Sequence, residues 1–85
     1  MEFVYVVTID EVVDCESAVH LPNVFKNEKD ALQFLKESYD DAKEDYKQYH
    51  TDMLYGFYVT SAEIYKCNDW NNTHWEIAMY KVPLH

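Results

Sequence analysis

The hydrophobic and polar positions follow a helical period between Asn27 and about Met53. Apolar residues recur there at steps of three and four, at Leu32, Leu35, Tyr39, Ala42, Tyr46, Tyr49 and Met53. This spacing places them along one face of a helix. Asn27 suits the N-cap, and Asp30 can act as the capping-box acid three residues later. We therefore predict one long amphipathic helix that ends between Tyr49 and Met53, before the chain's only glycine, Gly56.

Alternating patterns before this helix predict strands. Residues from Phe3 to Asp10 alternate with apolar side chains on both faces, as in a central strand, and the acids Asp10 and Glu11 then interrupt the pattern. A second, shorter strand is expected within residues 12–19 or at residues 24–25, after Pro22. Because proline cannot donate to a strand ladder, this segment belongs at an edge or in a loop.

The chain after the helix predicts a hairpin. Phe57 to Lys66 alternates as one strand, Asn68 to Thr73 has the composition of a turn, and Trp75 to Pro83 alternates again. The prediction is an α+β fold: a two-layer sandwich in which one long amphipathic helix packs on one face of an antiparallel sheet of three or four strands, in the order β(β)αββ. Residues 1–85 are expected to form a single domain.

The relative lengths of these elements suggest an exposed tyrosine surface. A helix of about 24 residues is about 36 Å long, whereas a strand of about eight residues spans about 27 Å. We therefore expect the last turns of the helix to extend past the sheet, with Tyr46, Tyr49 and Met53 on them. Tyrosine is enriched at the centres of protein interfaces, so this overhang is a candidate contact surface.

The charge of the chain excludes several classes of function. Sixteen acids stand against seven basic residues, all of them lysine, which gives a net charge of −9. Such a protein is repelled by nucleic acids and anionic membranes, and without arginine it lacks the usual bidentate ligand for phosphate. We expect no direct binding of nucleic acid or membrane. No apolar run reaches the roughly 20 residues of a membrane span, and no signal peptide is evident, so a cytoplasmic location is expected.

The acids concentrate on the back of the predicted helix. Five of them, between Glu37 and Asp45, lie within about 12 Å of helix axis, or one charge per roughly 2.4 Å. Duplex DNA carries one charge per roughly 1.7 Å. One interpretation is a solvated face that keeps the protein soluble; the other is a surface for a basic partner. The predicted partner-binding residues are Glu37, Asp40, Asp41, Glu44, Asp45, Tyr46, Tyr49, Asp52 and Trp70.

The cysteines and histidines offer weaker alternatives. Cys15, His20, Cys67 and His74 could form a zinc set, but they lack the close Cys-x2-Cys spacing of specific zinc motifs. Cys67, Asp69 and His74 could form a nucleophile, an acid and a base, but no oxyanion hole is evident. We therefore predict no catalytic residues, no metal and no cofactor.

Three segments carry a resemblance to small proteins of bacterial and phage genomes. They are Val4 to Val7, then Val24-Phe25 before the Asn27 cap, and Trp75-x-Ile77-x-x-Tyr80-x-Val82. The resemblance is to uncharacterised proteins, does not cover residues 40–55 and implies no defined activity. In size and acidity the chain is also similar to phage-encoded anti-CRISPR and anti-restriction proteins, which mimic nucleic acid.

These observations predict a non-enzymatic inhibitor or adaptor. Its partner would be a nuclease or another nucleic-acid-binding protein with a basic surface, bound in the host cytoplasm if the protein is phage-encoded. The alternative is a structural or regulatory domain that forms a homodimer through the tyrosine stripe or an edge strand.

Overall fold

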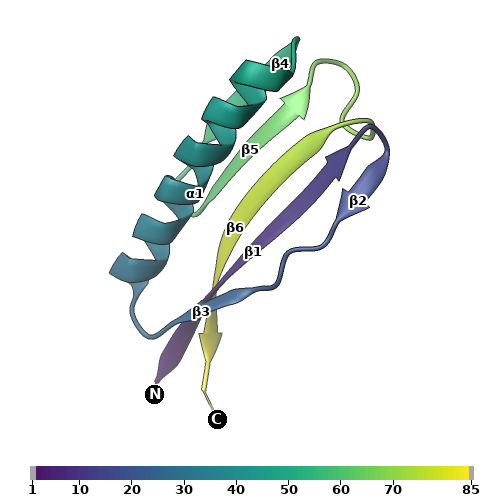
Figure 1. Ribbon diagram of the computed structural model, residues 1–85. Coiled ribbons are helices and arrows are strands. Elements are labelled where there is room, and N and C mark those ends of the chain that lie inside the picture. Colours follow the sequence, from purple (N-terminus) through teal and green to yellow (C-terminus); the bar gives the residue numbers. More distant parts are fainter. Residues whose placement is uncertain (1, 85) are drawn as a thin grey trace.

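The long amphipathic segment forms helix α1, Glu28–Tyr49, in the computed structural model, which describes residues 2–84 (Figure 1). Asn27 caps the helix as expected: its Oδ1 accepts a hydrogen bond of 2.9 Å from the backbone N–H of Asp30. The Asn27 amide in turn donates to the Asp30 carboxylate at 3.0 Å. The predicted helix start is thus confirmed, and the helix ends at Tyr49, the first residue of the range predicted for its end.

Helix α1 packs on an antiparallel sheet of six strands within the described residues. The strands are β1 (Phe3–Val13), β2 (Glu16–Ala18), β3 (Asn23–Phe25), β4 (Met53–Phe57), β5 (Ser61–Lys66) and β6 (His74–Pro83). Their order across the sheet is β2-β1-β6-β5-β4, and β3 pairs with β1. The helix covers one face, and both ends of the chain lie at the same end of the sheet (Figure 1). The α+β class is therefore confirmed.

Strand β1 organises the sheet. It pairs with β6 from Phe3↔Pro83 to Val12↔His74. Its other edge pairs with β3 at Tyr5–Val7 and with β2 at Glu11–Val13. Residues 19–22, which we call the strap, connect these two short strands alongside β1. Both predicted positions of the second strand are thus occupied, although Asp10 and Glu11 do not end β1 as expected.

The predicted strand count and order were wrong because two short strands were missed or merged. Phe57–Lys66 is not one strand: Phe57 ends β4, and β5 begins at Ser61 after a turn closed by a hydrogen bond from Tyr58 N–H to the Ser61 carbonyl. This turn has no glycine, proline or asparagine to mark it. Gly56 lies within β4 rather than ending the helix, and the order is βββαβββ.

The expected overhang of the helix was also wrong. The 22 residues of α1 span about 33 Å, and the 11 residues of β1 span about 36 Å. Strand β1 therefore reaches as far as the last turns of the helix. Tyr46 is 5% exposed, whereas Tyr49 is 73% exposed. Met53 lies outside the helix and begins β4.

The core lies between α1 and the helix-facing side chains of the sheet. Its fully buried apolar members include Leu35, Val7, Ile64 and Ile77. Around them pack Ala31, Tyr39, Tyr46, Ala62 and Trp75. The apolar stripe of the helix is thus the feature that fixes α1 on the sheet.

Candidate functional site

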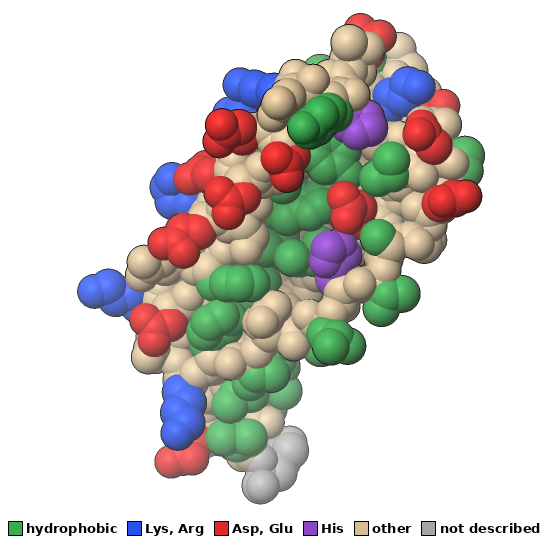
Figure 2. Space-filling model, viewed as in Figure 1, with side chains coloured by type: hydrophobic (Ala, Val, Ile, Leu, Met, Phe, Trp, Pro, Cys, Tyr) green, Lys and Arg blue, Asp and Glu red, His purple; other side chains and the backbone are tan. Residues whose placement is uncertain are grey.

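The acidic face of α1, defined as Glu37, Asp40, Asp41, Glu44 and Asp45, is exposed along its length (Figure 2). Lys36 forms an ion pair of 2.9 Å with Asp40, and Gln33 donates a hydrogen bond to Glu37. Within residues 2–84, the other three acids form no ion pair. Their charges are therefore available to a partner.

The lysines of the second half of the helix lie towards β4. Lys43 Nζ is 5.6 Å from the centroid of the Tyr55 ring, and Lys47 Nζ is 5.5 Å from the same ring. The helix border towards β1 carries Asp41 and Asp45 instead. Lys43 and Lys47 thus lie on the opposite border of α1 from Asp41 and Asp45.

A cleft of about 390 Å³ lies between the second half of α1, strand β1 and the strap. Its apolar lining consists of Ile9, Val13, Ala42 and Trp75. Its polar lining consists of Glu11, His20, Ser38, Asp45, Tyr46, Tyr49 and His50. Figure 2 shows this apolar hollow beside the acidic face. The cleft has no lysine in its lining.

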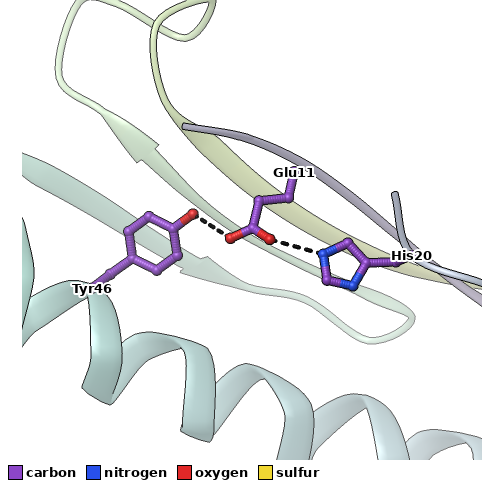
Figure 3. A network of polar contacts seen from close by, with 3 residues as sticks. All are labelled: Glu11, His20 and Tyr46. Atoms are coloured by element: carbon purple, nitrogen blue, oxygen red, sulfur yellow. Dashed lines mark hydrogen bonds and ion pairs between the residues drawn. The ribbon is translucent and has the colours of Figure 1, made fainter. Parts of the chain in front are cut away.

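Glu11 joins three elements at the wall of the cleft (Figure 3). Tyr46 on α1 donates its O–H to Glu11 Oε2 at 2.8 Å. His20 on the strap places Nε2 2.8 Å from Glu11 Oε1. Burial, followed by the hydrogen bond to Glu11 and its negative charge, raises the pKa of Tyr46 far above the ordinary value. Tyr46 therefore keeps its proton and remains the hydrogen-bond donor to Glu11.

The three predicted apolar anchors, Tyr46, Tyr49 and Trp70, lie in three different environments. Tyr46 is not an exposed anchor, because its ring packs in the core and its hydroxyl is bonded to Glu11. Tyr49 is exposed and lines the cleft. Trp70 is half-buried in the β5–β6 loop, where its ring stacks on His74 with centroids 4.3 Å apart, and it does not line the cleft.

Asp52 is exposed, but it lies outside the helix. It lies in the turn between α1 and β4 with a φ of 59°, a left-handed conformation that aspartate tolerates better than most residues. The acidic face therefore ends at Asp45, and Asp52 is separated from it by the helix C-terminus.

Glu11, His20 and His50 are cleft residues that the sequence interpretation missed. The sequence pattern predicts that Asp10 and Glu11 interrupt the first strand. Glu11 follows Val7 and Ile9 at steps of two and so lies on the same face of β1, the face that packs on the helix. An acid in phase with core positions is a signal for a buried polar partner, and this signal could have identified Glu11.

The cysteines and histidines do not form the alternative sites. Cys15 and Cys67 are exposed and unlinked. His74 places Nδ1 2.7 Å from the Trp70 carbonyl and Nε2 3.3 Å from Asp10, so neither ring nitrogen is directed to Cys67 or Asp69. In the part of the chain that the structure describes, no three His, Cys, Asp or Glu side chains converge as metal ligands.

No protein-family model, curated protein or solved structure matches the chain. Between residues 2 and 84, no helix is both long and apolar enough to cross a membrane.

Proposed function

We propose that the protein is a non-enzymatic binding module, an inhibitor or adaptor, that engages a basic nucleic-acid-binding protein through the acidic face of α1. The observation that carries the proposal is the exposure of Asp41, Glu44 and Asp45 without a cationic partner in residues 2–84. A nuclease or another DNA- or RNA-binding protein has a basic groove that such a surface would fit. In size and acidity this resembles phage anti-CRISPR and anti-restriction inhibitors, which act in the host cytoplasm.

The arrangement of charges favours binding over solubility alone. Glu37, Asp41 and Asp45 follow one another at steps of four, and each such like-charge pair destabilises a helix by a few tenths of a kcal/mol. A face that serves only to keep a helix soluble is best built from interspersed charges of both signs. Here the lysines of the second half instead lie over the ring of Tyr55, away from Asp41 and Asp45.

The proposal is tested by capture of proteins from a bacterial lysate on the immobilised protein. The test variant is the double reversal Asp41→Lys/Glu44→Lys. The control is Asp69→Lys/Glu76→Lys, which makes the same charge change at exposed positions on other elements. We expect the wild type and the control to retain nucleic-acid-binding proteins that the test variant loses.

Two further measurements decide the interpretation of this capture. Added duplex DNA should displace the retained proteins, because both would occupy the same basic groove. Moderate salt should release them, since exposed charges are screened. Equal retention by the wild type and the Asp41→Lys/Glu44→Lys variant would overturn the proposal.

A second candidate function, a homodimeric structural or regulatory domain, is favoured by the sheet face that α1 leaves uncovered. The strand register places Val24 beside Val6 and Val6 beside Tyr80. Val24 is 61% exposed and Tyr80 is 55% exposed. Light scattering at high micromolar concentration tests this role: a dimer that Tyr80→Lys dissociates supports it, and a strict monomer excludes it.

A further inference from the structure

We propose that the cleft between α1, β1 and the strap binds an arginine side chain of the partner. This inference rests on the proposed function, because it names the residue that anchors a basic partner beside the acidic face. It adds a site of defined shape to what is otherwise a contact between charged surfaces. The arginine must come from a different protein and not from a second copy of this chain, since this chain contains no arginine.

The lining of the cleft suits the stem and the planar head of arginine. Ile9, Val13 and Ala42 supply apolar contacts for a methylene stem. Aromatic surface is supplied by Trp75, Tyr49 and His50, and the His50 ring stacks on Tyr46 with centroids 4.9 Å apart. Guanidinium groups stack on aromatic faces and are more weakly hydrated than ammonium groups. The lining therefore favours arginine over lysine.

The charge of the cleft is complementary to a cation. Asp45 lines one wall and has no ion pair in residues 2–84, and Glu11 lines the other with its side chain 20% exposed. The reduced solvent access of Glu11 strengthens its interaction with an incoming charge. The lining has no lysine, and its only cationic candidates are His20, which contacts Glu11, and His50.

The size of the cleft and its surroundings define the rest of the recognised segment. A volume of about 390 Å³ is near the lower end of the roughly 300–1,000 Å³ of small-molecule sites, so it accommodates one large side chain with adjoining backbone. On the strap, Val19 is 91% exposed and Leu21 is 82% exposed, on either side of His20. We therefore expect the arginine to be flanked by apolar residues.

The test uses the end-blocked peptide Gly-Leu-Arg-Leu-Gly, titrated into the ¹⁵N-labelled protein to low-millimolar concentration and followed by NMR. Matched peptides carry lysine or citrulline in place of arginine. We expect the arginine peptide to shift the amide signals of Ile9 and Ala42 and the indole signal of Trp75. Citrulline has a similar shape but no charge, so its peptide should bind about tenfold more weakly, equivalent to about 1.4 kcal/mol. The lysine peptide should fall between the two.

Two variants separate the cleft from general charge attraction. Ala42→Leu fills the cleft and leaves every carboxylate in place, and Asp45→Asn removes one charge from its wall. Each should weaken the arginine peptide about tenfold, equivalent to about 1.4 kcal/mol, whereas Asp69→Asn, the same change on the β5–β6 loop, should not. If Ala42→Leu fails to fold, Asp45→Asn carries the test, because its side chain is exposed.

Two results would overturn the inference. One is equal affinity for the arginine and lysine peptides, with shifts spread over Glu37 and Glu44 on the far side of the helix. The other is the absence of any shift at low-millimolar peptide. Either result leaves the proposed function standing if Asp41→Lys/Glu44→Lys still abolishes protein capture, so the two failures are distinguishable.

Discussion

Tyr46 and Glu11 are joined by a hydrogen bond of 2.8 Å that connects the C-terminal part of the buried helix stripe to the central strand β1. The two residues are separated by 35 positions in the chain, so the bond forms only when helix and sheet have docked. It also forms part of the wall of the cleft, because both side chains line it. The same contact therefore contributes to the stability of the fold and to the shape of the candidate site.

Removal of the Tyr46 hydroxyl should destabilise the protein measurably. Tyr46→Phe keeps the buried ring but leaves Glu11 with His20 as its remaining side-chain partner. Hydrogen bonds to charged groups contribute roughly 1.5–3 kcal/mol, and because Glu11 keeps some access to water we expect a loss of about 1–2 kcal/mol. Urea unfolding measures this. The matched control, Tyr49→Phe at an exposed position, should change stability by less than about 0.5 kcal/mol.

The stability of the protein should fall as the pH rises above 10. Burial and then Glu11 raise the pKa of Tyr46 above its ordinary value of 10.0. Above pH 10 the unfolded chain loses the Tyr46 proton while the folded protein keeps it, so the stabilisation present below that pH is lost. Tyr46→Phe should show a shallower decline between pH 9 and 11. Some decline should remain, since burial also raises the pKa of Tyr39. Parallel profiles for the two proteins would contradict the role of the Tyr46–Glu11 bond.

A single charge reversal should separate stability from binding on the acidic face. Asp41→Lys replaces a like-charge neighbour of Glu37 and Asp45 with an opposite charge. Helix pairs at this spacing are worth about 0.2–0.5 kcal/mol each, so thermal unfolding should show a protein of equal or slightly greater stability. The same variant should retain less of the captured basic protein. A variant that is less stable and also retains less of the basic protein would indicate that Asp41 supports the fold instead.

The core contact of the helix should be sensitive to truncation. Leu35 is 1% exposed between α1 and the sheet, and large-to-small changes at such positions cost about 2–5 kcal/mol. Leu35→Ala should therefore lower the urea midpoint strongly. Leu21→Ala on the strap, where the side chain is 82% exposed, should leave the midpoint nearly unchanged. Similar losses for the two variants would mean that the strap packs against the core.

The helix was predictable because its pattern has several independent signals. The apolar residues at steps of three and four, the Asn27 cap and the acids of the first turn all indicate the same element. For strands β4 and β5, no such set of independent signals marks the boundaries. Met53 continues the helical spacing after Tyr46 and Tyr49, and the turn at residues 58–60 lacks the residues that mark turns. Local pattern alone could not separate β4 from its neighbours.

The cleft could not be predicted, because it depends on pairing between distant segments. Glu11 and His20 meet only because β2 and β3 both pair with the same edge of β1 and leave the strap between them. The burial of Tyr46 likewise depends on the length of β1, which continues to Val13 although the sequence pattern predicts an interruption at Asp10 and Glu11. The charges of the acidic face required no such information, since exposed acids can be placed from the helical period alone.

The acidic face of α1 is tested most directly as a binding surface by the affinity of a captured, purified basic protein for the wild type and for Asp41→Lys/Glu44→Lys as a function of salt. For the wild type, we predict an affinity that falls steeply with salt. The double reversal should bind at least about tenfold more weakly at low salt, a loss of at least about 1.4 kcal/mol, and the control Asp69→Lys/Glu76→Lys should bind as the wild type does. An affinity that is unchanged in Asp41→Lys/Glu44→Lys and does not depend on salt would show that the acidic face of α1 is not the binding surface.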